Sequence, residues 1–263
     1  MTLFKYELKQ LKTNLIVWAL CMGGLIFLMH PTYIGFTAGS DAAIMDLMND
    51  NAIFDILGVD AGFIMAPLGM FSFLNGFAMI AAAIHGMSIA FSSHTKEYTS
   101  KSAEFLLTKP HSRGKVFWAK FAACVIAVWI VGFVYMVGAA LALLTVNGAS
   151  IDWLAFILIA KTLPLVALMF VVFGTLAGTF FSKVRTPALI SSCVMLVLFC
   201  LSAMSKKINV PILGYLTPFS FFTPLRIIET KFYEWNFVIW YFILGTGLLL
   251  ICYKKFIKKD IVF

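Results

Sequence analysis

The densest group of charged and hydroxyl side chains in the sequence lies within residues 92–115, between two long apolar segments. Glu97 and Glu104 stand seven residues apart and therefore share one face of a helix that contains both. The pattern predicts a short helix over residues 96–108. Pro110 ends it, because the residue before a proline avoids helical backbone angles.

An apolar group, Phe105-Leu106-Leu107, stands among these charges. An exposed apolar cluster beside charged side chains is typical of a surface that another protein binds. The chemistry we expect of this segment is therefore recognition of a partner. The alternative is a solvated loop that folds back on its own bundle.

Motifs for nucleotide hydrolysis are missing from the sequence. A phosphate-binding loop needs G-x-x-x-x-G-K-[ST], whose backbone amides and lysine surround the phosphates. The Gly114-Lys115 pair is followed by Val116, and Lys109 stands where the first glycine is needed. The sequence also has no H-E-x-x-H zinc motif and no G-x-S-x-G nucleophile turn. We therefore expect that this chain is not an enzyme.

The cysteines give no sign of a metal site. They lie in or beside apolar segments, without the spacing of metal ligands, at Cys21, Cys124, Cys193, Cys200 and Cys252. A free cysteine commonly behaves as a small buried hydrophobe. We expect no metal and no cofactor on this chain.

The composition is that of a membrane protein. Apolar residues make up 62% of the chain and charged residues 12%, whereas soluble domains are about half apolar and about a quarter charged. A helix needs about 20 apolar residues to cross a bilayer. Six segments of this kind predict an all-α polytopic membrane protein, with spans near residues 14–30, 66–92, 117–146, 153–181, 187–204 and 236–253.

The charge distribution predicts the orientation of these spans. The net charge of +8 would suggest nucleic acid in a soluble protein. Here Lys and Arg gather at the N-terminus, after the second and fourth spans and in the tail, while the loops at 31–65 and 147–152 have none. Cytoplasmic loops collect Lys and Arg, which places both termini in the cytoplasm. The loop at 205–235 departs from this rule, with Lys206, Lys207, Arg226 and Lys231.

Both ends of the chain carry basic segments that flank the spans. Residues 1–13 have an apolar stripe and a lysine stripe at helical spacing, which predicts an amphipathic helix in the membrane interface with its lysines near anionic lipid. A simple start signal for membrane insertion is the alternative. We expect one domain over 1–263, with a six-span bundle at 14–253 and a basic cytoplasmic tail at 254–263.

Two motifs resemble the type-2 permease family of ABC transporters. The first is Glu104-Phe105-Leu106-Leu107-Thr108-Lys109-Pro110-His111-Ser112-Arg113, preceded by Glu97 and followed by Lys120. It resembles the E-x-L-L-x-x-P-x-S-R run in that family's first cytoplasmic loop. Tyr98-Thr99-Ser100 stands where the family commonly has a glycine. The second, Tyr215-Leu216-Thr217-Pro218-Phe219-Ser220-Phe221-Phe222, resembles the run before the family's last span.

The resemblance implies a set of partners. The loop at 96–115 would be a coupling helix that docks on a separate ATPase subunit, which would bind ATP and Mg²⁺. A second copy of the chain, or a related permease, would complete the transporter. The implied contacts with the ATPase subunit are Glu97, Lys101, Glu104, Phe105, Leu107, Arg113, Lys183 and Arg185.

Four residues within the spans are candidates for a substrate path. Phe73 and Phe77 share a helix face and could form an adaptable apolar wall. His85 and Lys161 are ionisable residues at membrane depth, where such groups are frequently functional. Ordinary packing for Phe73, Phe77 and His85, and a Lys161 side chain that reaches outward to the interface, are the alternatives.

The sequence thus predicts the transmembrane subunit of an ABC exporter in a bacterial plasma membrane. The substrate classes considered are an amphipathic or antimicrobial peptide, a drug or a lipid. The rival hypotheses are an ATP-independent carrier, a sensor subunit that moves no substrate, and an intramembrane enzyme. The spans as predicted contain no Asp or Glu, which argues against a carrier driven by carboxylates.

Overall fold

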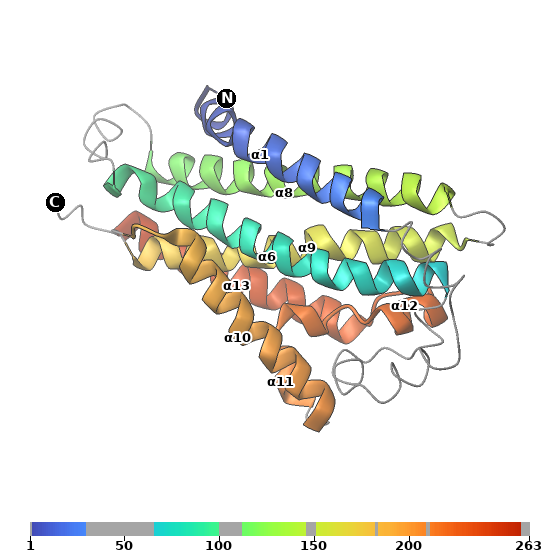
Figure 1. The fold of residues 1–263 in the computed structure, drawn as a ribbon. Coiled ribbons are helices and arrows are strands. Elements are labelled where there is room, and N and C mark those ends of the chain that lie inside the picture. Colours follow the sequence, from blue (N-terminus) through green and yellow to red (C-terminus); the bar gives the residue numbers. More distant parts are fainter. Residues whose placement is uncertain are drawn as a thin grey trace.

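A computed structural model of the chain describes residues 2–29, 66–99, 112–145, 151–181, 184–208 and 211–258. Within these ranges the chain is helical and has no strand (Figure 1). Six helices are long and apolar enough to cross a membrane. This confirms the predicted all-α polytopic architecture. The long helices are α1 (Thr2–Met29), α6 (Pro67–Thr99), α8 (Arg113–Leu144), α9 (Trp153–Phe180), α10 (Pro187–Ile208) and α13 (Trp235–Lys258).

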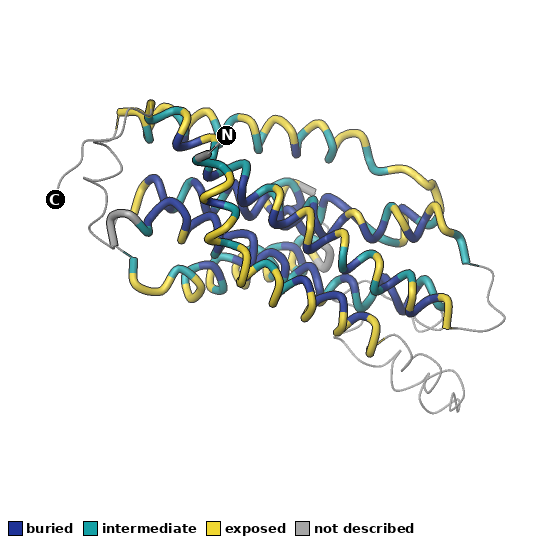
Figure 2. Tube along the Cα trace, turned by 90° about the horizontal axis from the view of Figure 1, so that it is seen from above, coloured by how far each residue is buried: buried dark blue, intermediate teal, exposed yellow. Residues whose placement is uncertain are grey.

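The long helices form a bundle with two distinct ends. Figure 1 shows the start of α1 and the end of α13 at the same end of the bundle, together with the end of α6 and the start of α8. We call this the basic end, because its helix termini carry Lys5, Lys96, Arg113 and Lys258. Buried positions gather inside the bundle, and exposed positions follow the outward faces of the helices (Figure 2).

Helices α1, α6 and α13 continue through polar residues past the predicted spans at the basic end. Residues 2–13 are the first part of α1 rather than a separate interfacial helix, and α6 continues to Thr99 where a new helix was predicted to begin at residue 96. The first five residues of the predicted tail at 254–263 belong to α13. No proline or glycine interrupts the chain at these three junctions, so the backbone hydrogen bonds of each helix continue beyond its apolar part.

Helix α9 lies at the centre of the bundle, and glycines bring α6 into direct contact with it. A Cβ on Gly174 would lie 2.3 Å from the Met87 carbonyl oxygen, and one on Gly178 would lie 2.7 Å from the His94 Cβ. Gly86 on α6 meets the backbone of Ala167 in the same way, at 2.6 Å. The Gly174–Gly178 spacing in the sequence indicates close helix approach, and the structure confirms it.

Side chains from other segments bond to the α9 backbone on both sides of Pro164. Asn75 of α6 donates to the Thr162 hydroxyl at 3.0 Å and lies 3.4 Å from the Ile159 carbonyl oxygen. The Tyr241 hydroxyl of α13 donates to the Leu165 carbonyl at 2.9 Å. Non-regular backbone at membrane depth is tolerated where side chains supply hydrogen bonds of this kind.

The chain between α10 and α13 packs back into the bundle. It contains α11 (Pro211–Tyr215), the short 3₁₀ helix η1 (Pro218–Ser220) and α12 (Pro224–Thr230). Phe219 of η1 is buried, with its ring 5.4 Å from Phe170 of α9 and 5.8 Å from Phe199 of α10. The second family-like motif, at 215–222, is therefore a packing segment that joins α9, α10 and α13.

An ion pair and a helix cap meet at the start of α9. Asp152 accepts hydrogen bonds from the amides of Leu154 and Ala155, at 3.1 and 3.3 Å. Lys231 lies 2.9 Å from its other carboxylate oxygen. Lys231 and these amides hold the pKa of Asp152 below its usual value.

We predict that Gly174→Ala destabilises the protein. The new methyl group meets the Met87 carbonyl, and overpacking of this kind costs about 1–3 kcal/mol. The thermal unfolding midpoint of the detergent-solubilised protein measures the loss. Gly247→Ala is the matched control, because a Cβ there has no atom within 4 Å. An unchanged midpoint for Gly174→Ala would contradict the close contact between α6 and α9.

A second prediction concerns the pH dependence of Asp152. Because the folded-state pKa is lowered, the charged group stabilises the protein above its unfolded pKa near 3.8. That contribution is lost as the pH falls through the folded-state pKa. Asp152→Asn keeps the capping shape without the charge, so its midpoint should lie below that of the native protein at pH 7. The difference should shrink below about pH 4, and a constant difference would contradict the assignment.

Candidate functional site

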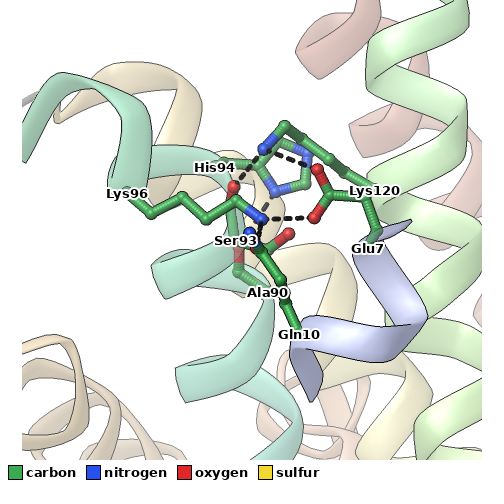
Figure 3. Close-up of polar contacts among 7 residues, drawn as sticks. All are labelled: Glu7, Gln10, Ala90, Ser93, His94, Lys96 and Lys120. Atoms are coloured by element: carbon green, nitrogen blue, oxygen red, sulfur yellow. Dashed lines mark hydrogen bonds and ion pairs between the residues drawn. The ribbon is translucent and has the colours of Figure 1, made fainter. Parts of the chain in front are cut away.

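A charged cluster at the basic end joins three helices through Glu7 (Figure 3). Lys96 of α6 donates to one carboxylate oxygen of Glu7 and also to the Gln10 side chain. Lys120 of α8 lies 3.4 Å from the other Glu7 oxygen. Lys120 also donates to the Ser93 carbonyl at 2.6 Å. One carboxylate thus contacts lysines from two other helices.

Helical spacing places each member of this cluster. Glu7 and Gln10 are three residues apart on α1 and therefore share the face that meets α6. Lys96 stands in the last turn of α6. Lys120 lies two turns into α8, and its side chain points toward Glu7.

Burial makes the pairing in this cluster important for stability. The side chains of Glu7 and Lys120 are 2% and 1% exposed, while that of Lys96 is 30% exposed. Two charges removed from water lose their hydration, and removal of one partner leaves the other charge buried and uncompensated. Lys96, at the exposed edge, adds a second positive charge to the same carboxylate.

The polar side chains of the cluster bond to one another and to the helix backbone. Its members are a carboxylate, two lysines and an amide, all engaged with one another or with backbone carbonyls. His94 beside it bonds to the Ala90 carbonyl at 2.9 Å and packs on Phe117. In the described ranges no group of three or more His, Cys, Asp or Glu side chains could hold a metal ion.

The predicted ATPase contacts fall in two segments of the sequence, 97–113 and 183–185. Lys101, Glu104, Phe105, Leu107 and Lys183 lie outside the described residues. Glu97 belongs to α6, immediately after Lys96. Arg113 begins α8, and its guanidinium donates to the Ile257 carbonyl of α13 at 3.1 Å. Arg185 is exposed in the short segment before α10. Their proposed contacts with a partner stay predictions.

The four predicted path residues lie on two helices, with Phe73, Phe77 and His85 on α6 and Lys161 on α9, and their role in a substrate path stays a prediction. His85 is buried between α1 and α6, where it bonds to Asn14 at 2.8 Å and stacks on Trp18. Phe73 and Phe77 contact each other edge to face at 5.1 Å, and Phe77 is 52% exposed. Lys161 is exposed on α9. The surroundings of His85 agree with the packing alternative.

Sequence reasoning missed Glu7 and the burial of Lys120. The signal in the sequence is that Glu7 falls on the apolar stripe of residues 1–13, opposite the lysine stripe and three residues before Gln10. Its partners lie 89 and 113 residues away, so local spacing could not pair them. Lys120 was noted only as the lysine that opens a span.

Comparison with known proteins identifies a family. Residues 1–261 match the family described as ABC-2 family transporter protein. No curated protein matches the chain. The family match covers nearly all of the sequence, including the cluster around Glu7.

We predict that Glu7→Gln destabilises the protein by about 3–5 kcal/mol, because it leaves the buried Lys120 without its counter-charge. The unfolding midpoint in detergent measures the loss. Glu229→Gln, which alters an exposed acid at the other end of the bundle, is the control. Glu7→Gln combined with Lys120→Gln should recover part of the stability, since neither charge then remains buried. Additive losses in the double variant would show that the two side chains do not interact.

Proposed function

The chain belongs to the ABC-2 family of transporter proteins, and on this premise we propose that it is the transmembrane subunit of an ATP-driven exporter. Membership makes it a multi-pass membrane component of an ABC transporter, whose partner is an ABC ATPase subunit. The ATPase, with its ATP and Mg²⁺, is proposed to bind the basic end. The proposed location is a bacterial plasma membrane, with both termini in the cytoplasm.

The observation that carries this proposal is the Glu7 cluster. It fixes the end of α6 and the first turns of α8 to α1, and these two helices flank the segment that carries the family-like motif. A force applied to the linking segment would reach α6 and α8 at the points where Glu7 holds them. The ion pairs of Glu7 with Lys96 and Lys120 would pass that force directly to α1.

The transport step would then be a rearrangement of helices. ATP-driven closure of the ATPase subunits would displace the segment between α6 and α8, and α1 would follow through Glu7, Lys96 and Lys120. The exporter would need a second permease chain, with the substrate passing between the two.

An amphipathic peptide is the substrate class that we favour, since Phe77 offers apolar surface and Met and Phe side chains adapt to varied ligands. Drugs and lipids are the next classes.

The proposal predicts that the ATPase binds through the segment after α6. Glu97→Lys combined with Glu104→Lys should abolish co-purification with the ATPase subunit, because two acidic charges of the proposed docking segment are reversed. Glu229→Lys, at the opposite end of the bundle, should leave the complex intact. Failure of the native chain to form a complex with any ABC ATPase would contradict the proposal and favour an ATP-independent carrier.

A second measurement separates binding from coupling. In lipid nanodiscs, Glu7→Gln should keep the ATPase bound in the folded protein, since the Glu7 side chain is buried inside the bundle and offers no surface to a partner. Substrate-dependent stimulation of ATP hydrolysis should fall. Full stimulation in Glu7→Gln would contradict the role of the cluster in coupling.

A further inference from the structure

A basic surface at the same end lies where α8 begins and α13 ends. It consists of Lys115, Trp118, Lys254 and Lys258, and we call it the α8–α13 patch. We propose that this patch binds the headgroup of an anionic phospholipid in the adjacent membrane leaflet. The proposal needs only that the helices span a membrane, so it stands apart from the coupling role of Glu7.

Aromatic side chains beneath the patch pack α8 against α13. The Phe117 ring lies 5.6 Å from Tyr253 and 5.4 Å from Phe256. Arg113 bonds to the Ile257 carbonyl, and a Cβ on Gly114 would lie 3.0 Å from the Tyr253 hydroxyl oxygen. The first turn of α8 is therefore held against the last turns of α13.

The exposed side chains lie around this contact. Lys115 and Trp118 are three residues apart on α8, and Lys254 and Lys258 are four apart on α13, so each pair shares a helix face. Trp118 is 48% exposed, and its ring lies 6.0 Å from Tyr253, which joins the two faces. All three lysines are exposed.

The described ends of α8 and α13 contain no acid that balances the charge of the patch. Residues 113–120 and 251–258 contain no Asp or Glu. Among the described residues, none of Lys115, Lys254 and Lys258 takes part in an ion pair. In contrast, Lys120 forms an ion pair with Glu7. Lysines without counter-charges at a helix end attract anions, and each contributes appreciably to binding an anionic membrane surface.

The position of the patch indicates a lipid rather than a soluble anion. Beyond the lysines the same two helices expose apolar side chains, which include Ile126 and Trp129 on α8 and Leu250 and Ile251 on α13. Acyl chains would lie along this surface while the phosphate meets the lysines. Tryptophan and lysine are the residues that anchor helices at the boundary between headgroups and hydrocarbon. An exposed tryptophan one helical turn after Lys115 matches that boundary.

Native mass spectrometry of the purified full chain tests the proposal. The chain would be titrated with phosphatidylglycerol and, separately, with phosphatidylcholine. We expect phosphatidylglycerol to be retained more strongly. The triple variant Lys115→Gln/Lys254→Gln/Lys258→Gln should retain it about 10-fold to 100-fold more weakly, because three charges near the phosphate are lost.

A matched control removes the same charge from the same end of the bundle. Lys5→Gln/Lys9→Gln/Lys12→Gln alters three lysines of α1, which lie on another helix. This variant should keep most of the binding. Lys254→Glu, a single reversal at an exposed position, gives a second test that leaves the packing untouched.

Three results would overturn the proposal. They are equal retention of the two lipids by the native chain, unchanged phosphatidylglycerol retention in the triple variant, and an equal loss in the α1 control, which would indicate general charge attraction. Loss of the ATPase partner with unchanged lipid retention would assign the patch to that protein. Because the readout is lipid binding, its outcome is independent of whether the coupling proposal holds.

Discussion

The packing of α6 against α9 is the contact on which the rest of the bundle depends. Gly86, Gly174 and Gly178 remove the side chains that would separate the two backbones, and dispersion contacts then extend along both helices. Within a membrane, apolar side chains gain little from leaving lipid, so close packing is the main source of helix association. With α6 and α9 fixed, α8 and α13 can pack on α9 from other sides. Gly132 of α8, for example, lies against the ring of Pro164.

The Glu7 cluster adds a different kind of constraint, because it specifies one arrangement of the helices at the basic end. Apolar helices can slide past one another by small steps at modest cost. A buried carboxylate that must contact Lys120 cannot, since a shift that breaks the pair leaves two charges without hydration. The exposed partner, Lys96, can change its contact with less penalty. The cluster therefore combines a fixed pair in the interior with an adjustable one at the edge, beside the segment that leads to the proposed partner.

Hydropathy and glycine spacing predict much of this fold. Six apolar segments gave six spans, and the Gly174–Gly178 pair correctly indicated close approach. Helix ends were predicted less well, because the prediction ended each span where apolar residues ended. Helical hydrogen bonding continues through polar residues such as Lys5 and Lys254 when no proline or glycine stops it. The Glu7 contacts could not be predicted, since the pairing depends on the mutual rotation of α1, α6 and α8.

The Glu7 cluster and the α8–α13 patch lie at the same end of the bundle, but their lysines differ in whether an acid neutralises their charge. This difference separates their roles. Lys120 meets Glu7 within the protein, so its charge fixes helix positions and is closed to outside ligands. Lys115 and Lys254 are exposed where the apolar faces of α8 and α13 end, so their charges face headgroups and solvent. A lipid bound at α8 and α13 would set the depth of these two helices in the membrane. The two arrangements therefore act on different contacts, because the buried pair fixes α1 relative to α8, whereas the α8–α13 patch would fix α8 and α13 relative to lipid.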